Sequence, residues 1–302
     1  PWAAVLGVFA ALAVGLFFAV PALILGAQEG KIEARFPPTF TTSASFDEGD
    51  ASAIALDPGT GRLYADHEDE VRVFGVRGVE IAKAKITGLE DSHGLAVDPA
   101  AGTLIVSEQG PGRIAFFAAG QGGDGGHGGT AGSQGGASAA PGPTSIVDGS
   151  KIGGLADFQP ERLAAAPGAT GGLYVIDAGD DQVLRLDRAG ALAGRLDAAK
   201  APAGSFDGGS NDNDIAVNSH RGAGFGDVFV LSGKGDGKVW AFSRAGRFLW
   251  ELEPEKHDEF AALTVDSAGD LWIAEPGGDV YEYGASAGVG KAPERTGRKI
   301  AA

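Results

Sequence analysis

Four polar residues, each lying at or just before the start of a short apolar run, have side chains suited to binding a divalent cation. They are His93, Glu161, Asn213 and Asp214. Hard oxygen ligands suit Ca2+, and a bound divalent ion would polarise a carbonyl group, such as that of a lactone, or activate water. The chain has five such apolar runs at the starts of repeated segments, and at two of them the neighbouring residues are only Ser or Ala. The sequence therefore outlines a candidate metal site with an incomplete set of ligands.

A second set of acidic residues recurs at the ends of apolar runs: Asp57, Asp98, Asp177 and Asp266. Short Asp side chains at such places accept hydrogen bonds from the backbone N–H groups of a following turn. Their regular recurrence favours one structural role for all four over a role in catalysis. We therefore expect them to stabilise turns.

Several other chemistries lack the residues that they need. The 302-residue chain has no cysteine, which excludes disulfides, thiol nucleophiles and thiolate metal sites. It contains neither a Gly-x-Ser-x-Gly motif nor a His-Glu-x-x-His motif. Its net charge of −16, without a basic stripe, repels nucleic-acid phosphates. These absences exclude nucleic acid as a partner and favour a protein that is not an enzyme.

The elements that must position these residues come from an internal repeat. Five segments share an apolar run that ends near Asp, a turn with Gly, a second run that is often aromatic, and a third run. The runs are short and rich in β-branched and aromatic residues, which predicts strands. Three or four strands per repeat of about 40–45 residues predict an all-β protein, a β-propeller. The repeats begin at Ile54, Leu95, Leu163, Ile215 and Leu263, at spacings of 41, 68, 52 and 48 residues.

The repeat pattern, Ile-Ala-Val-Asp, then Gly, then Leu-Tyr-Val-Ala-Asp and Arg-Val-x-x-Phe, is clearest in residues 173–177 and 213–252. Over residues 50–284 it resembles the NHL-repeat β-propellers, including exported bacterial proteins of that kind. The resemblance implies that the first run of each repeat is the inner strand, which places the four ligand candidates at the mouth of the central channel. Related lactonase-type propellers carry acidic and Asn residues there. Because a fold does not fix a function, the site must be argued separately.

Residues 1–27 contain no charged or strongly polar residue. About 20 apolar residues span a bilayer, whereas the apolar part of a cleaved signal peptide has about 7–15 residues. The length favours a retained transmembrane helix over a cleaved signal, with a buried core helix as a third interpretation. Either of the first two places the rest of the chain outside the cytoplasm: at the cell surface, or in the periplasm or secreted if the segment is cleaved.

Three further segments complete the domain organisation. Residues 28–49 are expected to form a linker or a closing strand, and residues 285–302 a C-terminal tail or a closing strand. Residues 119–143 are rich in Gly and poor in apolar side chains, which predicts a flexible insertion in the propeller. Five blades are legible, and we favour six blades or an incomplete ring over a true five.

These observations predict an extracytoplasmic, membrane-anchored propeller that acts as a non-enzymatic binding, sensory or scaffold module. The expected partner is a protein, a glycan or a cell-wall component, and no cofactor is required. The alternative function is a metal-dependent, lactonase-like hydrolase or lyase with one divalent cation, such as Ca2+, at the channel mouth.

Overall fold

The computed structural model describes residues 51–75, 78–119, 142–168, 171–196, 213–232, 237–254, 259–276, 279–284 and 291–300. The chain divides into two compact units, residues 1–42 and 43–302, and every described residue belongs to the second. The predictions for residues 1–27 and 28–49, and for most of residues 119–143, lie outside the described residues. Within the described ranges, no helix is long and apolar enough to cross a membrane.

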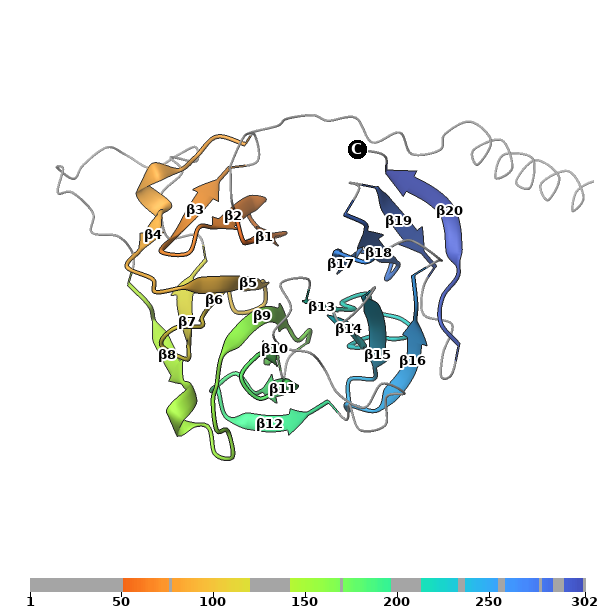
Figure 1. Cartoon of the computed structure of the whole chain (residues 1–302). Helices are drawn as coiled ribbons and strands as arrows, with labels where there is room; N and C mark the ends of the chain where they lie inside the picture. The colour runs from red at the N-terminus through yellow and green to blue at the C-terminus, as the bar shows by residue number, and fades with distance from the viewer. Residues whose placement is uncertain are drawn as a thin grey trace, which may run out of the picture. The chain divides into compact units, whose positions relative to one another are not determined.

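Twenty strands in the described part of the chain form five antiparallel sheets of four strands, and each sheet uses consecutive strands (Figure 1). The sequence-based prediction of an all-β propeller with five legible blades is therefore confirmed.

Two 3-10 turns accompany the strands, η1 (Ala82–Ala84) and η2 (Gly149–Lys151). The blades are, in chain order, blade 1 with β1 (Ala53–Asp57), β2 (Arg62–Asp66), β3 (Glu70–Phe74) and β4 (Ile86–Thr87); blade 2 with β5 (Ser92–Asp98), β6 (Thr103–Glu108), β7 (Arg113–Ala118) and β8 (Ser145–Asp148); blade 3 with β9 (Pro160–Ala165), β10 (Leu173–Asp177), β11 (Gln182–Leu186) and β12 (Leu192–Arg195); blade 4 with β13 (Asp214–Val217), β14 (Val228–Ser232), β15 (Lys238–Phe242) and β16 (Phe248–Leu252); and blade 5 with β17 (Ala262–Val265), β18 (Leu271–Ala274), β19 (Val280–Tyr283) and β20 (Arg295–Ile300).

The first strand of each blade is its inner strand. Successive inner strands lie side by side from β1 to β5, β9, β13 and β17. Side chains alternate between the two faces of a strand, so each sheet can pack one face against the preceding blade and one against the following blade. The residues before the inner strands are thereby brought to one end of a common channel.

Four apolar cores in the described part of the chain hold the blades together, one at each junction from blade 1 to blade 5. Between blades 3 and 4, Tyr174 and Ile176 pack in the same cluster as Val230 and Trp240, and all four side chains are buried. Burying such a side chain stabilises the fold by about 1.5–3 kcal/mol. Blade-on-blade packing is therefore the main source of stability.

Blades 1 and 5 do not follow this pattern. Their inner strands β1 and β17 do not lie side by side as the other inner strands do. On β1, Ala53 and Ala55 pack against the blade 2 cluster, whereas Ile54 and Leu56 point away from it and are 67% and 60% exposed. The described residues thus form five blades with an open junction, and the favoured sixth blade is not among them.

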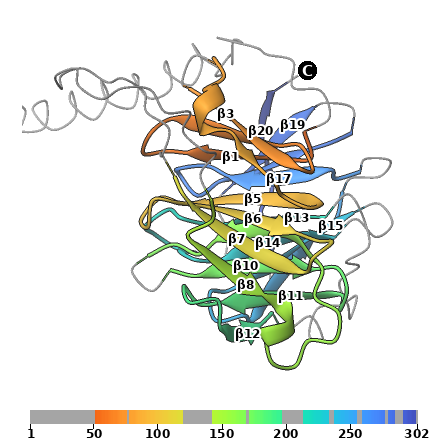
Figure 2. The same ribbon diagram turned by 90° about the vertical axis from the view of Figure 1, so that its left-hand side faces the viewer.

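The Gly-rich insertion belongs to blade 2. Strand β7 ends at Ala118 and β8 begins at Ser145, so residues 119–143 connect the third and fourth strands of one sheet. Both strands lie on the side that faces the viewer in Figure 2, and β8 is the last strand of its sheet. Ile114 still pairs with Val147 across the connection. The insertion therefore lengthens one hairpin, which accounts for the 68-residue spacing between the second and third repeats, without changing the order of the blades.

Gly94 on β5 lies where blades 2 and 3 are in close contact. A Cβ atom there would overlap the carbonyl oxygen of Glu161 and lie 2.8 Å from Ser107 Oγ. We expect Gly94→Ala to lower the free energy of unfolding by about 1–3 kcal/mol, because an overpacked contact forces the two inner strands apart. Urea unfolding followed by circular dichroism measures this change.

Gly153→Ala is the matched control, because a Cβ atom at that position meets no atom within 4 Å. If both variants unfold at the same urea concentration as the parent chain, the junction between blades 2 and 3 is not tightly packed.

Candidate functional site

The beginnings of the inner strands and the ends of the second strands meet at one end of the channel, because each pair is antiparallel. Ala53 pairs with Asp66 in blade 1, and Asp214 pairs with Leu231 in blade 4. We call this end the channel mouth. All four predicted ligand residues begin an inner strand or lie next to its start, so they belong to this end.

Arg162 extends from β9 and joins four blades at the channel mouth. Its Nη1 donates to the carbonyl oxygens of Ser52, at 2.8 Å, and of His93, at 2.6 Å. Its Nε donates to the carbonyl oxygen of Asn213 at 3.2 Å. These acceptors come from blades 1, 2 and 4, and a hydrogen bond from a charged donor stabilises a fold by about 1.5–3 kcal/mol. Arg162 therefore links blade 3 to blades 1, 2 and 4 through hydrogen bonds of one side chain.

Polar groups also join neighbouring blades in pairs. Ser107 Oγ of blade 2 donates to the Glu161 carbonyl oxygen of blade 3 at 2.7 Å. Asn213 Nδ2, before β13 of blade 4, donates to Glu161 Oε2 at 3.1 Å. The backbone N–H of Leu263 in blade 5 donates to Asp214 Oδ2 of blade 4 at 2.8 Å. Each of these three junctions thus has a direct polar link at the mouth.

Asp66 makes the equivalent link between blades 1 and 2. Its carboxylate accepts hydrogen bonds from Ser52 Oγ at 2.5 Å and from Ser92 Oγ of blade 2, and its side chain is fully buried. We call the linking residues the mouth belt: Asp66, Ser107, Glu161, Asn213 and Asp214.

Burial raises the pKa of the three carboxyl groups in the mouth belt, Asp66, Glu161 and Asp214. Hydrogen bonds from neighbouring blades oppose this effect in each case, as does the positive charge of Arg162 for Glu161 and Asp214. The belt therefore contains acids that take up a proton at higher pH than exposed acids do.

The structure brings three of the four predicted ligand residues together. Glu161 and Asn213 are hydrogen bonded, and Asp214 directly follows Asn213. The His93 side chain is directed elsewhere, because its Nε2 lies 3.0 Å from Asp91 Oδ1 in a partly exposed pair. The three clustered residues already serve as donors or acceptors for neighbouring blades.

The acids assigned to turns divide into two groups. Asp57, Asp98 and Asp266 each accept the backbone N–H two residues further along the turn, at 2.9, 3.0 and 2.8 Å. Asp177 lies at the end of a second strand and accepts the backbone N–H of Gln159 at 2.9 Å. Its carboxylate also accepts hydrogen bonds from the backbone N–H of Gly179 and, at 3.1 Å, from Gln182 Nε2. Asp177 therefore holds both the turn that follows β10 and the segment that leads into β9.

A cavity of about 650 Å3 begins at the channel mouth and includes the open junction between blades 1 and 5. Arg162, Asn213 and Asp214 contribute polar groups to it. This volume lies within the range of about 300–1,000 Å3 that is typical of ligand sites. Its apolar wall includes side chains from both sides of the open junction, among them Ile54, Leu56, Leu263, Trp272 and Val280.

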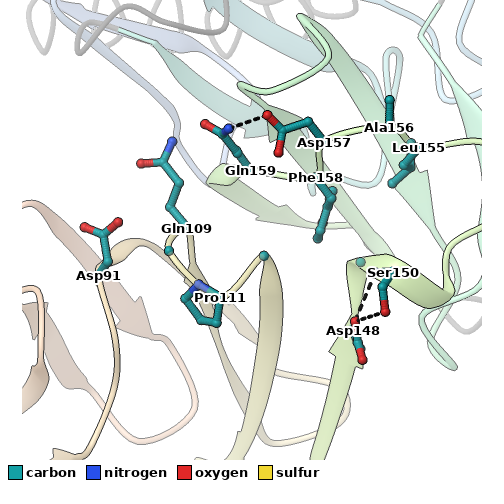
Figure 3. A pocket seen from close by; sticks show the side chains of 13 residues that line it. Asp91, Gln109, Pro111, Asp148, Ser150, Leu155, Ala156, Asp157, Phe158 and Gln159 are labelled. Atoms are coloured by element: carbon teal, nitrogen blue, oxygen red, sulfur yellow. Dashed lines mark hydrogen bonds between the residues drawn. The ribbon is translucent and has the colours of Figure 1, made fainter.

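A second cavity of about 490 Å3 lies between blades 2 and 3 (Figure 3). Its acids Asp91, Asp148 and Asp157 come from three separate segments, and in Figure 3 they do not point toward one another. Asp148 accepts from Ser150 Oγ at 2.6 Å, and Asp157 accepts from Gln159 Nε2 at 2.7 Å. This cavity has no convergent set of functional groups.

One group of acids among the described residues, Asp266, Asp270 and Glu282, has carboxylate oxygens within 4.8 Å of one another. Asp266 also accepts a hydrogen bond from Trp272 Nε1 at 3.1 Å, and Glu282 accepts one from Thr296 Oγ1 at 2.6 Å. The Asp266 and Glu282 carboxylates therefore act as hydrogen-bond acceptors within blade 5. Asp266 and Asp270 lie at the end of the sheet opposite the mouth belt.

No family model and no curated protein matches this chain. Several solved structures resemble it. The nidogen/laminin complex aligns with 13% identity and a TM-score of 0.53, over 83% of this chain and 79% of that chain. Virginiamycin B lyase from Staphylococcus aureus aligns with 12% identity and a TM-score of 0.50, over 82% and 69%.

The β-propeller domain of Cps50 (Swd1) from Myceliophteria thermophila aligns with 11% identity and a TM-score of 0.50, over 79% of this chain. This chain spans 66% of that chain's length. The likeness shows the fold alone. The propeller is thus confirmed, and membership of the NHL-repeat proteins stays a prediction.

Sequence reasoning selected the acids of the mouth and did not select Arg162 or Asp66. A signal for Arg162 exists, because the equivalent positions in the other four repeats hold Ala, Gly, Asp and Ala. A long cation at a position where other repeats have a small or acidic residue indicates a special role. A signal for Asp66 exists as well, because it ends β2 as Glu108 ends β6 and Asp177 ends β10. Its link to blade 2, through Ser92, leaves no signal within one repeat.

Asp66→Asn tests the contribution of a buried acid to the pH dependence of stability. Burial raises the pKa of Asp66 in the folded chain above its ordinary value of 3.8. The stabilising contribution of Asp66 is therefore complete below pH 3.8 and is lost as the pH rises past the pKa of the folded state. We expect the stability of Asp66→Asn, relative to the parent chain, to increase with pH. Ser hydroxyls can donate or accept, so Asn can still bind both.

Asp148→Asn is the control, because its stability relative to the parent chain should change with pH in the opposite direction. Hydrogen bonds from Ser150 lower the pKa of this exposed acid, so its stabilising contribution is lost as pH falls, and the relative stability of this variant should decrease as pH rises. Urea unfolding of the three chains between pH 3.5 and pH 7, a range chosen to span ordinary carboxyl pKa values, measures both trends. If the difference in the free energy of unfolding between Asp66→Asn and the parent chain does not change with pH, the pKa of Asp66 is not raised.

Proposed function

We propose that this chain is an exported, membrane-anchored propeller that binds a ligand at its channel mouth and catalyses no reaction. The observation that carries the proposal is the use of the mouth acids. Glu161 and Asp214 accept hydrogen bonds that join blades 3 to 4 and 4 to 5, while the adjoining cavity of about 650 Å3 is largely walled by apolar side chains. Such a site favours binding over hydrolysis.

A metal-dependent hydrolase or lyase is the second candidate, because Glu161, Asn213 and Asp214 lie together at the mouth. Their present arrangement does not fit a bound cation. Asn213 directs its NH2 group to Glu161 Oε2, both Asp214 oxygens accept backbone N–H groups, and the His93 side chain faces Asp91. Ca2+ requires six to eight oxygen ligands, and Glu161 and Asp214 offer fewer than that, since part of their acceptor capacity already serves backbone and amide N–H groups.

Export is supported by residues 1–27, which are long and apolar enough to span a bilayer. The net charge of −16 favours solubility and a monomeric state in an aqueous compartment. The proposed partners at that location are a protein, a glycan or a cell-wall component. A likeness in fold to the nidogen/laminin complex is consistent with a binding role and does not identify the partner.

The divalent metal content of the full chain distinguishes the two candidate functions. We expect less than about 0.1 equivalent of Ca2+ or Zn2+ per chain after purification without chelator, because the mouth acids are engaged in hydrogen bonds between blades. Elemental analysis measures this value, and lactone hydrolysis is assayed in parallel.

The double variant Glu161→Gln and Asp214→Asn is the matched control, because it removes two charges at nearly constant volume. One bound metal ion per chain, together with hydrolysis that both a chelator and this double variant abolish, would contradict the proposal and establish the hydrolase.

The predicted location can be tested with one introduced cysteine, since the chain has none. Ile146 on β8 is 48% exposed, so Ile146→Cys should react in intact cells with a maleimide that does not cross membranes. The cysteine-free parent chain is the control for unspecific labelling. Labelling only after cell lysis would place the propeller in the cytoplasm and contradict the proposed export.

A further inference from the structure

The open junction between blades 1 and 5 presents two sheet faces without a partner blade in the described part of the chain. On β1 the outward face consists of Ile54 and Leu56, which are 67% and 60% exposed. On blade 5, Leu263 packs against blade 4, whereas Ala262 and Thr264 alternate with it and are exposed. We call this space the slot. Its walls are largely apolar, and leaving them in water costs about 25 cal/mol per Å2 of apolar surface.

The slot and the channel mouth belong to one cavity. Ile54 and Leu56 on one side, and Thr264 and Trp272 on the other, line the same space as Arg162. Arg162 Nη1 donates to the carbonyl oxygen of Ser52, which precedes Ile54 by only two residues along the chain. A cation therefore lies at the inner end of an apolar slot.

One edge of the Arg162 guanidinium is available to a ligand. The hydrogen bonds of Arg162 leave from Nε and Nη1, and its Nη2 has no acceptor in the described part of the chain. Arg162 is partly buried and lines the cavity, and it forms no ion pair with a described carboxylate. Guanidinium groups bind carboxylates and phosphates with strong charge-assisted hydrogen bonds.

Two carboxyl groups near Arg162 reduce its positive potential. Glu161 and Asp214 both interact electrostatically with it, but each already accepts hydrogen bonds from its neighbours, and burial raises the pKa of both. The net charge of −16 also repels anions at long range. Affinity for an anion must therefore come from direct contact with Nη2 combined with burial of an apolar body.

We infer that the cavity binds an amphipathic monoanion, with its carboxylate head on Arg162 Nη2 and its apolar body in the slot between β1 and β17. This ligand class satisfies the open donor and covers Ile54, Leu56 and Trp272 at the same time. The inference rests on the proposed function as a binding module and names the chemistry of its ligand.

Three small probes separate the two parts of this recognition. Octanoate has both head and tail, acetate has only the head, and octylammonium has the same tail with the opposite charge. For the full chain in lipid nanodiscs, with empty nanodiscs subtracted, we expect octanoate to bind at least about tenfold more tightly than either of the other two, a difference of about 1.4 kcal/mol. Saturation-transfer NMR measures the three affinities.

Ile54→Glu tests the slot without disturbing a packed core, because the side chain is mostly exposed. We expect it to weaken octanoate binding at least about tenfold by placing a like charge in the apolar wall. Ile146→Glu on β8 is the matched control, since Ile146 is another exposed β-strand isoleucine and does not line the cavity. This variant should bind octanoate like the parent chain.

Equal binding of octanoate and octylammonium would overturn the role of Arg162, and absence of octanoate binding would overturn the inference. If Ile54→Glu instead lowers the free energy of unfolding, a segment of the chain itself covers the slot; if it converts a dimer to a monomer in light scattering, a second copy covers it. Either result also overturns the inference. The proposed binding function is tested separately, because only a bound metal ion together with lactone hydrolysis would contradict it.

Discussion

The guanidinium of Arg162 binds carbonyl oxygens from three other blades at the channel mouth, and the arrangement of the ring depends on this contact. Apolar packing between sheets is strong but weakly directional, so it does not by itself fix the position of one blade along the channel axis relative to the next. The hydrogen bonds of the mouth belt fix this position at the four closed junctions, since a buried polar group that loses its partner costs about 1–3 kcal/mol. Arg162 and the belt therefore define where the channel opens.

The same hydrogen bonds account for the chemistry of the mouth. Glu161 and Asp214 resemble metal ligands in residue type, but their lone pairs serve neighbouring blades. Arg162 has the opposite charge. It links the blades through Nε and Nη1, and its side chain lines the cavity. In this arrangement the acids link neighbouring blades, and the cation links blades while keeping one donor nitrogen without an acceptor in the described part of the chain.

The fold was predictable from the sequence because its signals are local. A run such as Leu173–Asp177 is wholly buried, and apolar second runs recur in every repeat. A turn acid such as Asp57 binds a group two residues away, and an acid recurs at that place in three of the five repeats. The mouth was predictable only in part. The bond from Arg162 to Ser52 joins residues 110 positions apart, and the open junction depends on which blades fail to meet, so neither leaves a signal in a single repeat.

Each blade takes its four strands from one continuous stretch of chain, and this has a consequence for the folding pathway. No strand must wait for a distant partner before its own sheet is complete, so contact order within a blade is low and each blade can form early. Growth then resembles that of a linear repeat array, in which every new unit is stabilised by the one before it. A chain of this kind can acquire its structure progressively from blade 1 as it emerges from a ribosome or a translocation pore.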